Sequence, residues 1–443
     1  MSKQPPARAA QIETGPWYKA LNGYHWWVLI VASLGWLFDT MDQRIFVPAR
    51  GPAMRELLPA GTSAADVTWY SGLATAVFMV GWALGGLFFG IMGDRWGRAK
   101  TMMLTILVYS GFTGLSALSR NEWDFMGYRF LTGLGVGGEF AAGVTLVAEV
   151  MPERARAHAL GLLQALSALG NVIGSALSFV VLPLGWRWMF TVGILPALLV
   201  VAVFRKMREP EAWQKVRDSV DAGGDKKQLG SIADLWTNPR WRRNTIVGLL
   251  LAISGVVGLW GIGFWSPELI REALKDLPLD QRNWYVSMGT LLQDVGAFLG
   301  IYTFTVVTAR IGRRPAFVIA FVLGMAATIM TFSLLHKPSD VLWMVPIMGF
   351  CTLLVFGGYS IYFPELYPTR LRSSGVGFCY NVGRIIAALG PFTLGGLTVL
   401  FRDAGYAAPF RAAAIALSSI YLVGLVAVLF APETKGKPLP EEA

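Results

Sequence analysis

Stretches of about 20 apolar residues recur along this chain, and they restrict the possible folds more than any other sequence feature. A helix of that length crosses the roughly 30 Å hydrocarbon core of a bilayer and satisfies its own backbone hydrogen bonds there. We predict twelve such spans, which makes the chain an all-α membrane protein. Their approximate bounds are 26–47, 69–92, 101–118, 125–148, 160–181, 189–204, 245–265, 285–308, 316–335, 341–363, 374–400 and 412–431.

The distribution of charge predicts how the spans are oriented. Only 15% of the 443 residues are charged, against roughly one quarter in soluble domains. Loops on the side predicted to hold both termini carry 25 Lys and Arg residues, and loops on the other side carry 10. Because basic loops stay in the cytoplasm, both termini are predicted to be cytoplasmic. The net charge of +10 then reflects membrane topology, and we expect no nucleic-acid partner.

One long polar stretch, residues 205–243, divides the predicted spans into two sets of six. It is rich in charge and contains a Gly-Gly pair, which is typical of a linker. The predicted organisation is a cytoplasmic N-terminal segment (1–25), an N-terminal six-helix half (26–204), the cytoplasmic linker (205–243), a C-terminal six-helix half (244–431) and a cytoplasmic tail (432–443).

Two loop motifs occur once in each half at nearly the same spacing. The sequence from Asp94 to Arg98 is echoed 215 residues later, and the sequence from Glu149 to Arg156 is echoed 216 residues later, from Glu365 to Arg372. Six spans return the chain to the same side of the membrane, so the two halves have the same orientation. Transporters built from such parallel repeats bind substrate near the midplane, between the repeats.

These motifs resemble those of the major facilitator superfamily over nearly the whole chain. Gly90-x-x-x-Asp94-Arg95-x-Gly97-Arg98 is similar to the loop signature of the superfamily, and Arg129-x-x-x-Gly133-x-Gly135-x-Gly137 is similar to its fourth-helix signature. Residues 364–369 (Pro-Glu-Leu-Tyr-Pro-Thr) and 432–436 (Pro-Glu-Thr-Lys-Gly) resemble the branch that contains sugar porters, organic-ion transporters and bacterial aromatic-acid proton symporters. The resemblance implies the major facilitator fold and transport by alternating access. The second loop copy departs from the pattern, because it has Ala309 in place of the acid.

Charges in these loops are predicted to form a latch on the cytoplasmic side. Ion pairs among them would hold the two halves together while the inner gate is closed and would separate when it opens. The alternative is that the basic members only fix the topology. The predicted gating residues are Asp94, Arg95, Arg98, Glu149, Arg156, Glu365 and Arg372.

Intramembrane charges without a counterpart in the other half are candidates for the specific chemistry, because such charges are expensive to bury. Asp39 and Asp42 share one face of the first span, at a depth similar to that of Arg129 in the fourth. A buried carboxylate that loses an Arg partner binds a proton, which would couple transport to protons. The element Phe-Asp-Thr at 38–40 resembles the one that proton-coupled sugar porters couple to the fourth-helix Arg. We therefore predict an Asp39–Arg129 pair, with Asp42 as a second candidate; the alternative is a static pair that fixes two helices.

Arg384 and Asp294 are predicted near mid-membrane, in the eleventh and eighth spans. The guanidinium fork of Arg grips carboxylates, and organic-anion and aromatic-acid relatives likewise have a functional Arg in the eleventh helix. We predict that Arg384 binds an organic anion and that Asp294 holds Arg384 when the site is empty; the alternative is a permanent structural pair. Aromatic side chains are predicted to line the site, although aromatics at span ends often anchor a helix at the interface. The predicted substrate-binding residues are Arg384, Asp294, Gln293, Tyr380, Asn381, Trp260, Phe264 and Tyr359.

The predicted function is proton-coupled symport that imports an organic anion, such as an aromatic or other small carboxylate. The alternatives are a proton-coupled sugar or polyol symporter and, in another class, a membrane sensor or channel on the same fold. We expect no enzymatic activity, no metal site and no cofactor besides the proton as coupling ion; Cys351 and Cys379 lack metal-ligand spacing. We expect a monomer in a cell membrane, the bacterial inner membrane in the simplest case. Glu139 in the fourth span fits either a proton relay or a gate partner.

Overall fold

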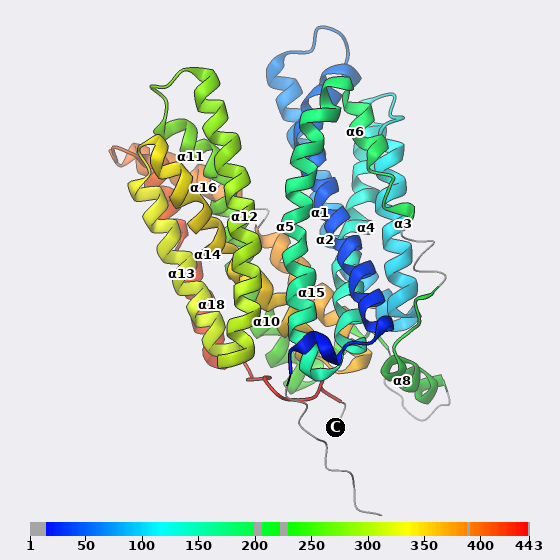
Figure 1. Ribbon diagram of the computed structural model, residues 1–443. Coiled ribbons are helices and arrows are strands. Elements are labelled where there is room, and N and C mark those ends of the chain that lie inside the picture. The colour runs from blue at the N-terminus through cyan, green and yellow to red at the C-terminus, as the bar shows by residue number, and fades with distance from the viewer. Residues whose placement is uncertain (1–14, 199–205, 222–228, 388–389, 442–443) are drawn as a thin grey trace, which may run out of the picture.

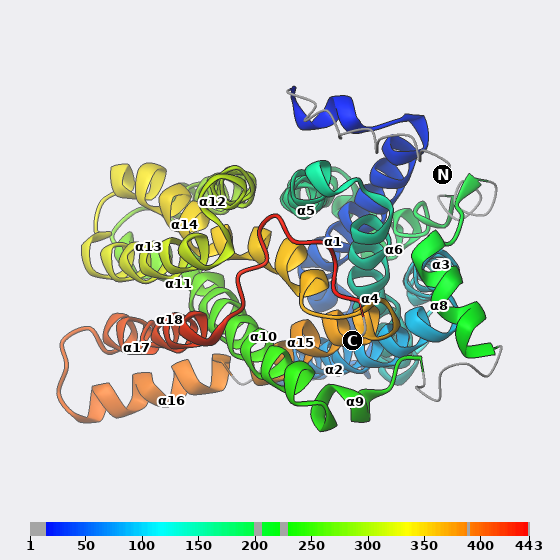
Figure 2. The same ribbon diagram turned by 90° about the horizontal axis from the view of Figure 1, so that it is seen from below.

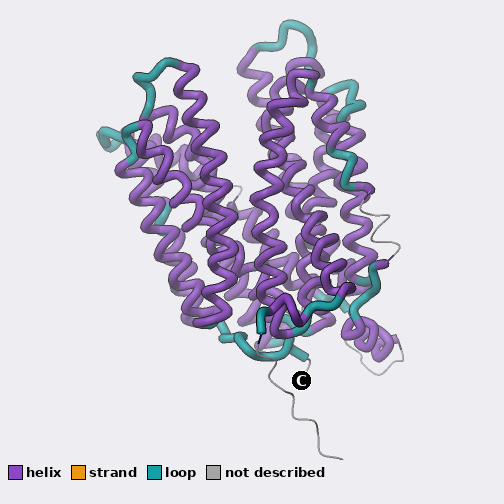
Figure 3. Tube along the Cα trace, in the orientation of Figure 1, coloured by secondary structure: helices purple, strands orange, loops and turns teal. Residues whose placement is uncertain are grey.

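The computed structural model describes residues 15–198, 206–221, 229–387 and 390–441 and is built of helices (Figure 1). Their bounds, with η for 3-10 and π turns, are η1 Trp17–Ala20, α1 Gly23–Leu57, α2 Ala64–Trp96, α3 Arg98–Ser116, α4 Glu122–Val150, α5 Glu153–Val181, η2 Leu182–Leu184, α6 Trp186–Val192, α8 Glu211–Asp221, α9 Ile232–Thr237, α10 Pro239–Val257, η3 Gly258–Ile262, η4 Gly263–Trp265, α11 Ser266–Ala273, α12 Leu279–Ile311, α13 Arg313–Leu334, α14 Pro338–Glu365, η5 Thr369–Leu371, α15 Arg372–Ala387, α16 Gly390–Asp403, α17 Pro409–Leu417 and α18 Ile420–Phe430. The long helices run side by side, and most loops gather at two opposite ends of the molecule (Figure 3). The predicted all-α class is confirmed.

The helices form two groups that meet at the end where the C-terminus lies, which we call the lower end (Figure 1). One group holds α1 to α6, and the other holds α10 to α14 and α16 to α18 (Figure 1). Helix α15 packs against α2 and α4 of the first group and α10 of the second, while α5 packs against α12 and α14. From below, α15 lies beside α2 and α4, at the junction of the two groups (Figure 2). Toward the upper end the ribbons of the two groups diverge (Figure 1).

Eight helical segments of the described chain are long and apolar enough to cross a membrane. The predicted spans that are not among these eight are 26–47, 101–118, 189–204 and 374–400. Helix α1 covers the first of them without a break, but it carries Asp39, Asp42 and Arg44, which reduce its apolar character. The last two include residues outside the described chain. The count of twelve and the side on which the termini lie therefore stay predictions.

Glycines bring the backbones of α2 and α4 together, as the four-residue step from Gly133 to Gly137 in the sequence suggests. A Cβ atom on Gly133 would clash with the carbonyl oxygen of Phe78, and one on Gly137 would clash with that of Trp82. Only a residue without a side chain lets the two helices approach this closely. This packing fixes the position of Trp82, which belongs to the candidate site described below.

We expect Gly137→Ala to lower the free energy of unfolding by about 1 to 3 kcal/mol, because the added methyl group forces α2 and α4 apart. Gly127→Ala, on the same helix, is the matched control, since a Cβ atom there would have no neighbour within 4 Å. Denaturant unfolding of both variants in detergent measures the difference. Equal stability of the two variants would contradict this account of the α2–α4 contact.

Candidate functional site

Asp42 and Arg129 form a buried ion pair between α1 and α4. Nη1 of Arg129 lies 3.4 Å from Oδ2 of Asp42, and neither side chain is more than 1% exposed. Thr113 of α3 joins them: its hydroxyl accepts a hydrogen bond from Nη2 of Arg129 (2.8 Å) and donates one to Oδ1 of Asp42 (2.7 Å). Each polar group in this trio is engaged, as a buried charge requires.

The prediction that Arg129 pairs with Asp39 is therefore wrong, because the partner is Asp42. Two acids three residues apart project from nearly the same face of a helix, so helical spacing alone does not choose between them. Thr113 of α3 distinguishes the two acids, because it lies beside Asp42 and forms hydrogen bonds with both Asp42 and Arg129.

Asp39 is fully buried and has no strong hydrogen-bond donor. Nε2 of Gln43 lies 3.4 Å from its Oδ1, and within the described part of the chain its Oδ2 has no hydrogen-bond partner. The charged residues that act on it are Glu139, Arg384 and Asp42. Asp39 is thus the acid of α1 that forms no ion pair among the described residues.

Arg384, on α15, lies between two aromatic rings at the junction of the helix groups. Its guanidinium carbon is 3.7 Å from the ring centroid of Trp82 and 4.2 Å from that of Tyr380, both suited to cation–π attraction. The residue is only 8% exposed, yet its Nε and Nη1 have no hydrogen-bond partner among the residues that the structure describes. A buried guanidinium with unused donors is expensive unless a ligand completes its hydrogen bonds.

The aromatic surroundings of Arg384 come from both helix groups. Tyr380 stacks on Phe140 of α4 at a centroid distance of 4.0 Å and an interplanar angle of 24°. Trp82 of α2 meets Trp260 of η3 edge to face at 6.3 Å. Of the predicted aromatic residues, Tyr380 and Trp260 therefore belong to this assembly. The assembly combines flat apolar surfaces with one cation, which suits a small organic anion.

The predicted Asp294–Arg384 pair is also wrong, because Asp294 pairs with Arg44. Nη2 of Arg44 on α1 lies 3.5 Å from Oδ2 of Asp294 on α12, and Nε of Arg44 donates a hydrogen bond to Ser175. The sequence indicated similar depths for Asp294 and Arg384, but depth does not determine the direction in which a side chain leaves its helix. The observed pair links the two helix groups at a separate place.

The other predicted substrate-binding residues differ in their surroundings. Gln293 supports the irregular turn before α11, since it accepts a hydrogen bond from Ser266 and donates one to the carbonyl of Gly263. Asn381 donates to the carbonyl of Gly377, and its Oδ1 has no partner in the described structure.

Tyr359 is not available to a ligand. It is fully buried, and its hydroxyl donates to the carbonyl of Leu251, so it belongs to the core behind Tyr380. The side chain of Phe264, another predicted member of the site, lies outside the described part of the structure.

Four of the predicted gating residues form one buried network at the lower end, which we call the charge cluster: Asp94, Arg98, Glu149 and Arg372. Arg98 binds both carboxylate oxygens of Glu149 (3.0 and 2.9 Å), and Nη1 of Arg372 lies 2.6 Å from Oε1 of Glu149. Asp94 lies 3.2 Å from Arg98 and accepts hydrogen bonds from the first backbone N–H groups of α15, those of Ser373 and Ser374. The charge cluster thus joins α2, α3 and α4 to α15.

The remaining three predicted gating residues lie outside the charge cluster. Glu365 forms a two-pronged pair with Arg313 (3.0 and 2.8 Å), which is the repeat of the Arg98–Glu149 pair. Arg95 donates to the carbonyl of Leu229, and Arg156 donates to that of Ala148. Arg156 also acts electrostatically on Glu365 and Glu149, but among the described residues these three form no direct bond with Arg372, so the predicted latch is divided into two bonded networks.

Two acids cap the helices that follow the repeated loops. Glu209 accepts hydrogen bonds from the N–H groups of Ala99 and Lys100 at the start of α3. Glu433 does the same for Arg313 and Arg314 at the start of α13. Although partial burial opposes ionisation, backbone hydrogen bonds hold the pKa of Glu433 below its usual value, as expected for a carboxylate at a helix N-terminus.

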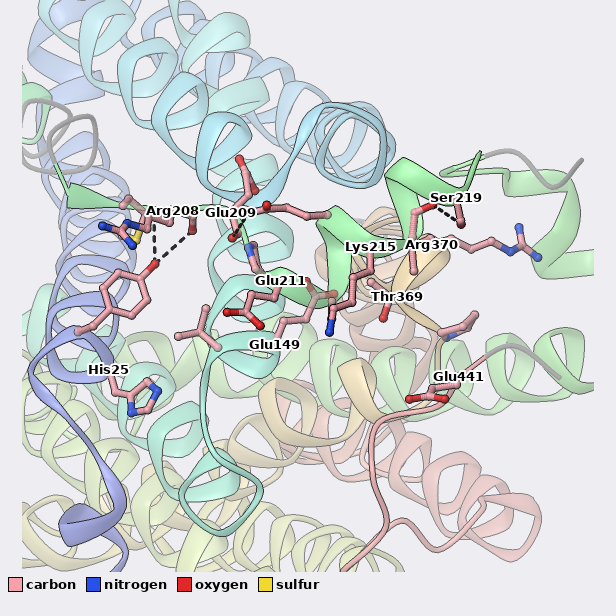
Figure 4. A pocket seen from close by; sticks show the side chains of 18 of the residues that line it. His25, Glu149, Arg208, Glu209, Glu211, Lys215, Ser219, Thr369, Arg370 and Glu441 are labelled. Atoms are coloured by element: carbon pink, nitrogen blue, oxygen red, sulfur yellow. Dashed lines mark hydrogen bonds between the residues drawn. The ribbon is translucent and has the colours of Figure 1, made fainter. Parts of the chain in front are cut away.

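The linker folds onto the charge cluster and is partly helical. Nε1 of Trp213, on α8, donates to the carbonyl of Asp94 (2.7 Å). A pocket of about 1450 Å³ lies beside it and is lined by Glu149, by the linker and by the loop before α15 (Figure 4). Acidic and basic side chains alternate around this pocket, for example Glu211 and Lys215 (Figure 4). In the described parts of the linker, α8 thus lies at the lower end of the first group, and α9 packs against α10 (Figure 2).

Sequence reasoning missed several of these residues. The repeat could have predicted Arg313, because this residue corresponds to Arg98 at an offset of 215. Trp82 had no signal, since an isolated Trp in an apolar span resembles an interface anchor. Glu209 and Trp213 lie in a polar segment whose composition does not indicate where it packs.

Comparison with known proteins gives a consistent set of matches. The profile of the Major Facilitator Superfamily matches residues 32–391. The "Putative metabolite transport protein" of Haemophilus influenzae is 31% identical, over 95% of this chain and 99% of its own length. The "Probable 4-methylmuconolactone transporter" of Cupriavidus pinatubonensis is 29% identical (95% and 93%), and the niacin transporter NiaP of Acinetobacter baylyi is 27% identical (95% and 96%). The solved structure of the proton:xylose symporter XylE has a TM-score of 0.75 at 17% identity, over 94% of this chain and 98% of that chain, so the two share a fold.

Proposed function

Because the chain belongs to the major facilitator superfamily, we propose that it is a proton-coupled symporter that imports a small organic anion by alternating access. Membership makes it a multi-pass membrane transporter and not an enzyme. The proposal further gives it twelve spans in two six-helix halves, 26–204 and 244–431, with both termini in the cytoplasm. The lower end of the structure is then the cytoplasmic side.

The observation that carries the choice of substrate is the state of Arg384. It is buried between Trp82 and Tyr380 with two guanidinium nitrogens unused. A small organic carboxylate would suit this site. Its oxygens would accept hydrogen bonds from the unused N–H groups of Arg384, and its apolar part would pack on the two rings. The names of two relatives agree with this chemistry, because 4-methylmuconolactone and niacin both carry a carboxyl group.

In this proposal, transport is coupled to protons because Asp39 and the substrate anion both interact with Arg384. In the empty site its positive charge acts on Asp39, which otherwise has acidic neighbours. A bound anion pairs with the guanidinium of Arg384 and neutralises its charge. The carboxylate of Asp39 is then no longer stabilised by that charge, so it binds a proton. Substrate and proton then enter together, and neither alone gives a neutral site that can be carried across.

The charge cluster supports a state closed toward the cytoplasm. Its bonds join α15 to α2, α3 and α4, and Ser360 of α14 adds a hydrogen bond to the carbonyl of Leu160 on α5. Inward opening must break these contacts, whereas toward the upper end the ribbons of the two groups diverge (Figure 1).

We expect Asp94→Asn to shift the population toward the inward-open state by roughly 1 to 3 kcal/mol, because the variant weakens the hydrogen bonds from the N–H groups of Ser373 and Ser374, which join α15 to α2 only in the closed state. The reporter is Ser360→Cys in a background without Cys351 and Cys379, since residue 360 is fully buried in the closed state. Labelling by a maleimide should become about 5- to 150-fold faster. Asp403→Asn, at an exposed ion pair, is the control; equal labelling in both variants would remove the gating role.

A thermal-shift screen of the purified protein tests the substrate class. Nicotinate, benzoate, nicotinamide and xylose are added separately, and a ligand present at 100 times its Kd stabilises the protein by about 2.7 kcal/mol. We expect a carboxylate to raise the unfolding temperature and nicotinamide, which has the ring of nicotinate without the charge, to have no effect. If only xylose stabilises the protein, the substrate is a sugar and the proposal of an organic anion is wrong.

A further inference from the structure

Glu139 is a buried acid that the coupling scheme above does not use. It lies on α4 and is 1% exposed. Its Oε1 lies against Gly35 of α1, where a side chain would clash with it, and no described residue forms a hydrogen bond with it. Its Oε2 contacts the hydroxyl of Thr105 on α3 at 2.6 Å. One neutral hydroxyl is poor compensation for a carboxylate charge at such a position.

The hydroxyl of Thr105 indicates the protonation state of this acid. Its Oγ1 lies 2.6 Å from Oε2 of Glu139 and 2.8 Å from the carbonyl oxygen of Met102. A hydroxyl has one proton, so it cannot donate to both oxygens. If Glu139 is protonated, it donates to Thr105, and Thr105 donates to Met102; both short contacts are then hydrogen bonds. If Glu139 is ionised, one of the two contacts has no proton.

The threonine beside Asp42 shows the opposite arrangement. Thr113 receives a hydrogen bond from Arg129 and donates its own proton to Asp42, which satisfies an ionised carboxylate. No basic side chain is bonded in this way to Thr105 in the described structure. The two acids therefore occupy sites built for different charges.

We propose that Glu139 holds a proton in this conformation and serves as a second proton carrier, which releases the proton to cytoplasmic water when the lower end opens. This inference rests on the proposed symport function. The ionisable groups that face Glu139 are Asp39 of α1 and Tyr109 of α3, and Arg384 of α15 acts on Asp39. Asp39 is one helical turn from Gly35 on the same face, so the two acids are neighbours. Inside, both acids release their protons. After the return, Asp39 takes a proton from outside and passes it to Glu139, and it takes a second proton when the anion binds, so each cycle moves two protons and Glu139 carries one of them.

Infrared spectroscopy of the purified protein tests the protonation without any substrate. A protonated carboxylic acid has a C=O stretching band that is separate from the bands of carboxylates. We expect Glu139→Gln to remove one such band at neutral pH, Thr105→Val to shift that band, and Asp403→Asn, at an exposed ion pair, to leave it in place. If Glu139→Gln leaves all protonated-carboxyl bands unchanged, the proposal is overturned.

Transport in proteoliposomes tests the carrier role, with nicotinate as the probe. The reversal potential gives the number of protons moved per nicotinate, and we expect this number to fall by one in Glu139→Gln while nicotinate exchange continues. An unchanged number, or loss of exchange in a folded variant, would show a structural role only. If the parent protein does not move nicotinate, the proposed function fails, whereas the infrared result still decides whether Glu139 is protonated.

Discussion

Arg384→Ala is expected to weaken nicotinate binding by at least about 30-fold, which corresponds to the roughly 2 kcal/mol lower limit for truncating one member of a buried charge pair. The variant removes the charge that lies between Trp82 and Tyr380, and no other basic side chain contacts these two rings in the described structure. Calorimetric titration of purified protein with nicotinate measures the change.

Two controls separate charge recognition from general damage to the site. Arg384→Lys keeps the charge but not the planar fork, so we expect an intermediate loss of affinity. Nicotinamide should bind weakly to the parent protein and no more weakly to Arg384→Ala. Retention of nicotinate affinity in Arg384→Ala would mean that the guanidinium serves only to pack the two rings.

Asp39→Asn is expected to abolish proton-driven accumulation of nicotinate while exchange of nicotinate across the membrane persists. The substitution removes the group that titrates, yet it keeps nearly the same shape and leaves Arg384 in place. Uptake with and without an imposed pH gradient, together with exchange, measures the two activities in one preparation. Accumulation that still follows the pH gradient would remove Asp39 from the coupling mechanism.

Asp42→Asn is the matched control on the same face of α1, and we expect it to lower the stability of the protein. It leaves Arg129 buried without a counter-charge, so we expect a loss of about 3 to 5 kcal/mol of stability. Arg384 acts on Asp39, but Asp39 forms no ion pair among the described residues, so its variant should unfold closer to the parent temperature than Asp42→Asn. Thermal unfolding of the two variants therefore distinguishes the coupling acid from the structural one.

The sequence predicted those parts of the structure that depend on local pattern or on the repeat. Apolar stretches predicted long helices, and the repeat offset carries the Arg98–Glu149 pair onto the pair formed by Arg313 and Glu365, which has the same two-pronged geometry. Such features recur because each repeat packs its own loop in the same way.

The partners of intramembrane charges could not be predicted in the same way. Helical rise gives the depth of a residue, but its partner depends on the rotation of each helix about its axis and on which helices are neighbours. Asp294 therefore faces Arg44 of the other group, and Arg384 reaches Trp82 because α15 crosses to α2. Depth alone already placed Asp42 nearer to the level of Arg129 than Asp39, and the family resemblance outweighed that indication.

The central claim, proton-driven import of an organic anion, is tested most directly by nicotinate uptake into proteoliposomes that hold only this protein. An inward pH gradient is imposed, and protein-free vesicles correct for passive entry of the acid. The account predicts that nicotinate accumulates above its external concentration, that a protonophore abolishes the accumulation, and that xylose is not accumulated. Equilibration of nicotinate to the same level with and without the gradient would contradict it.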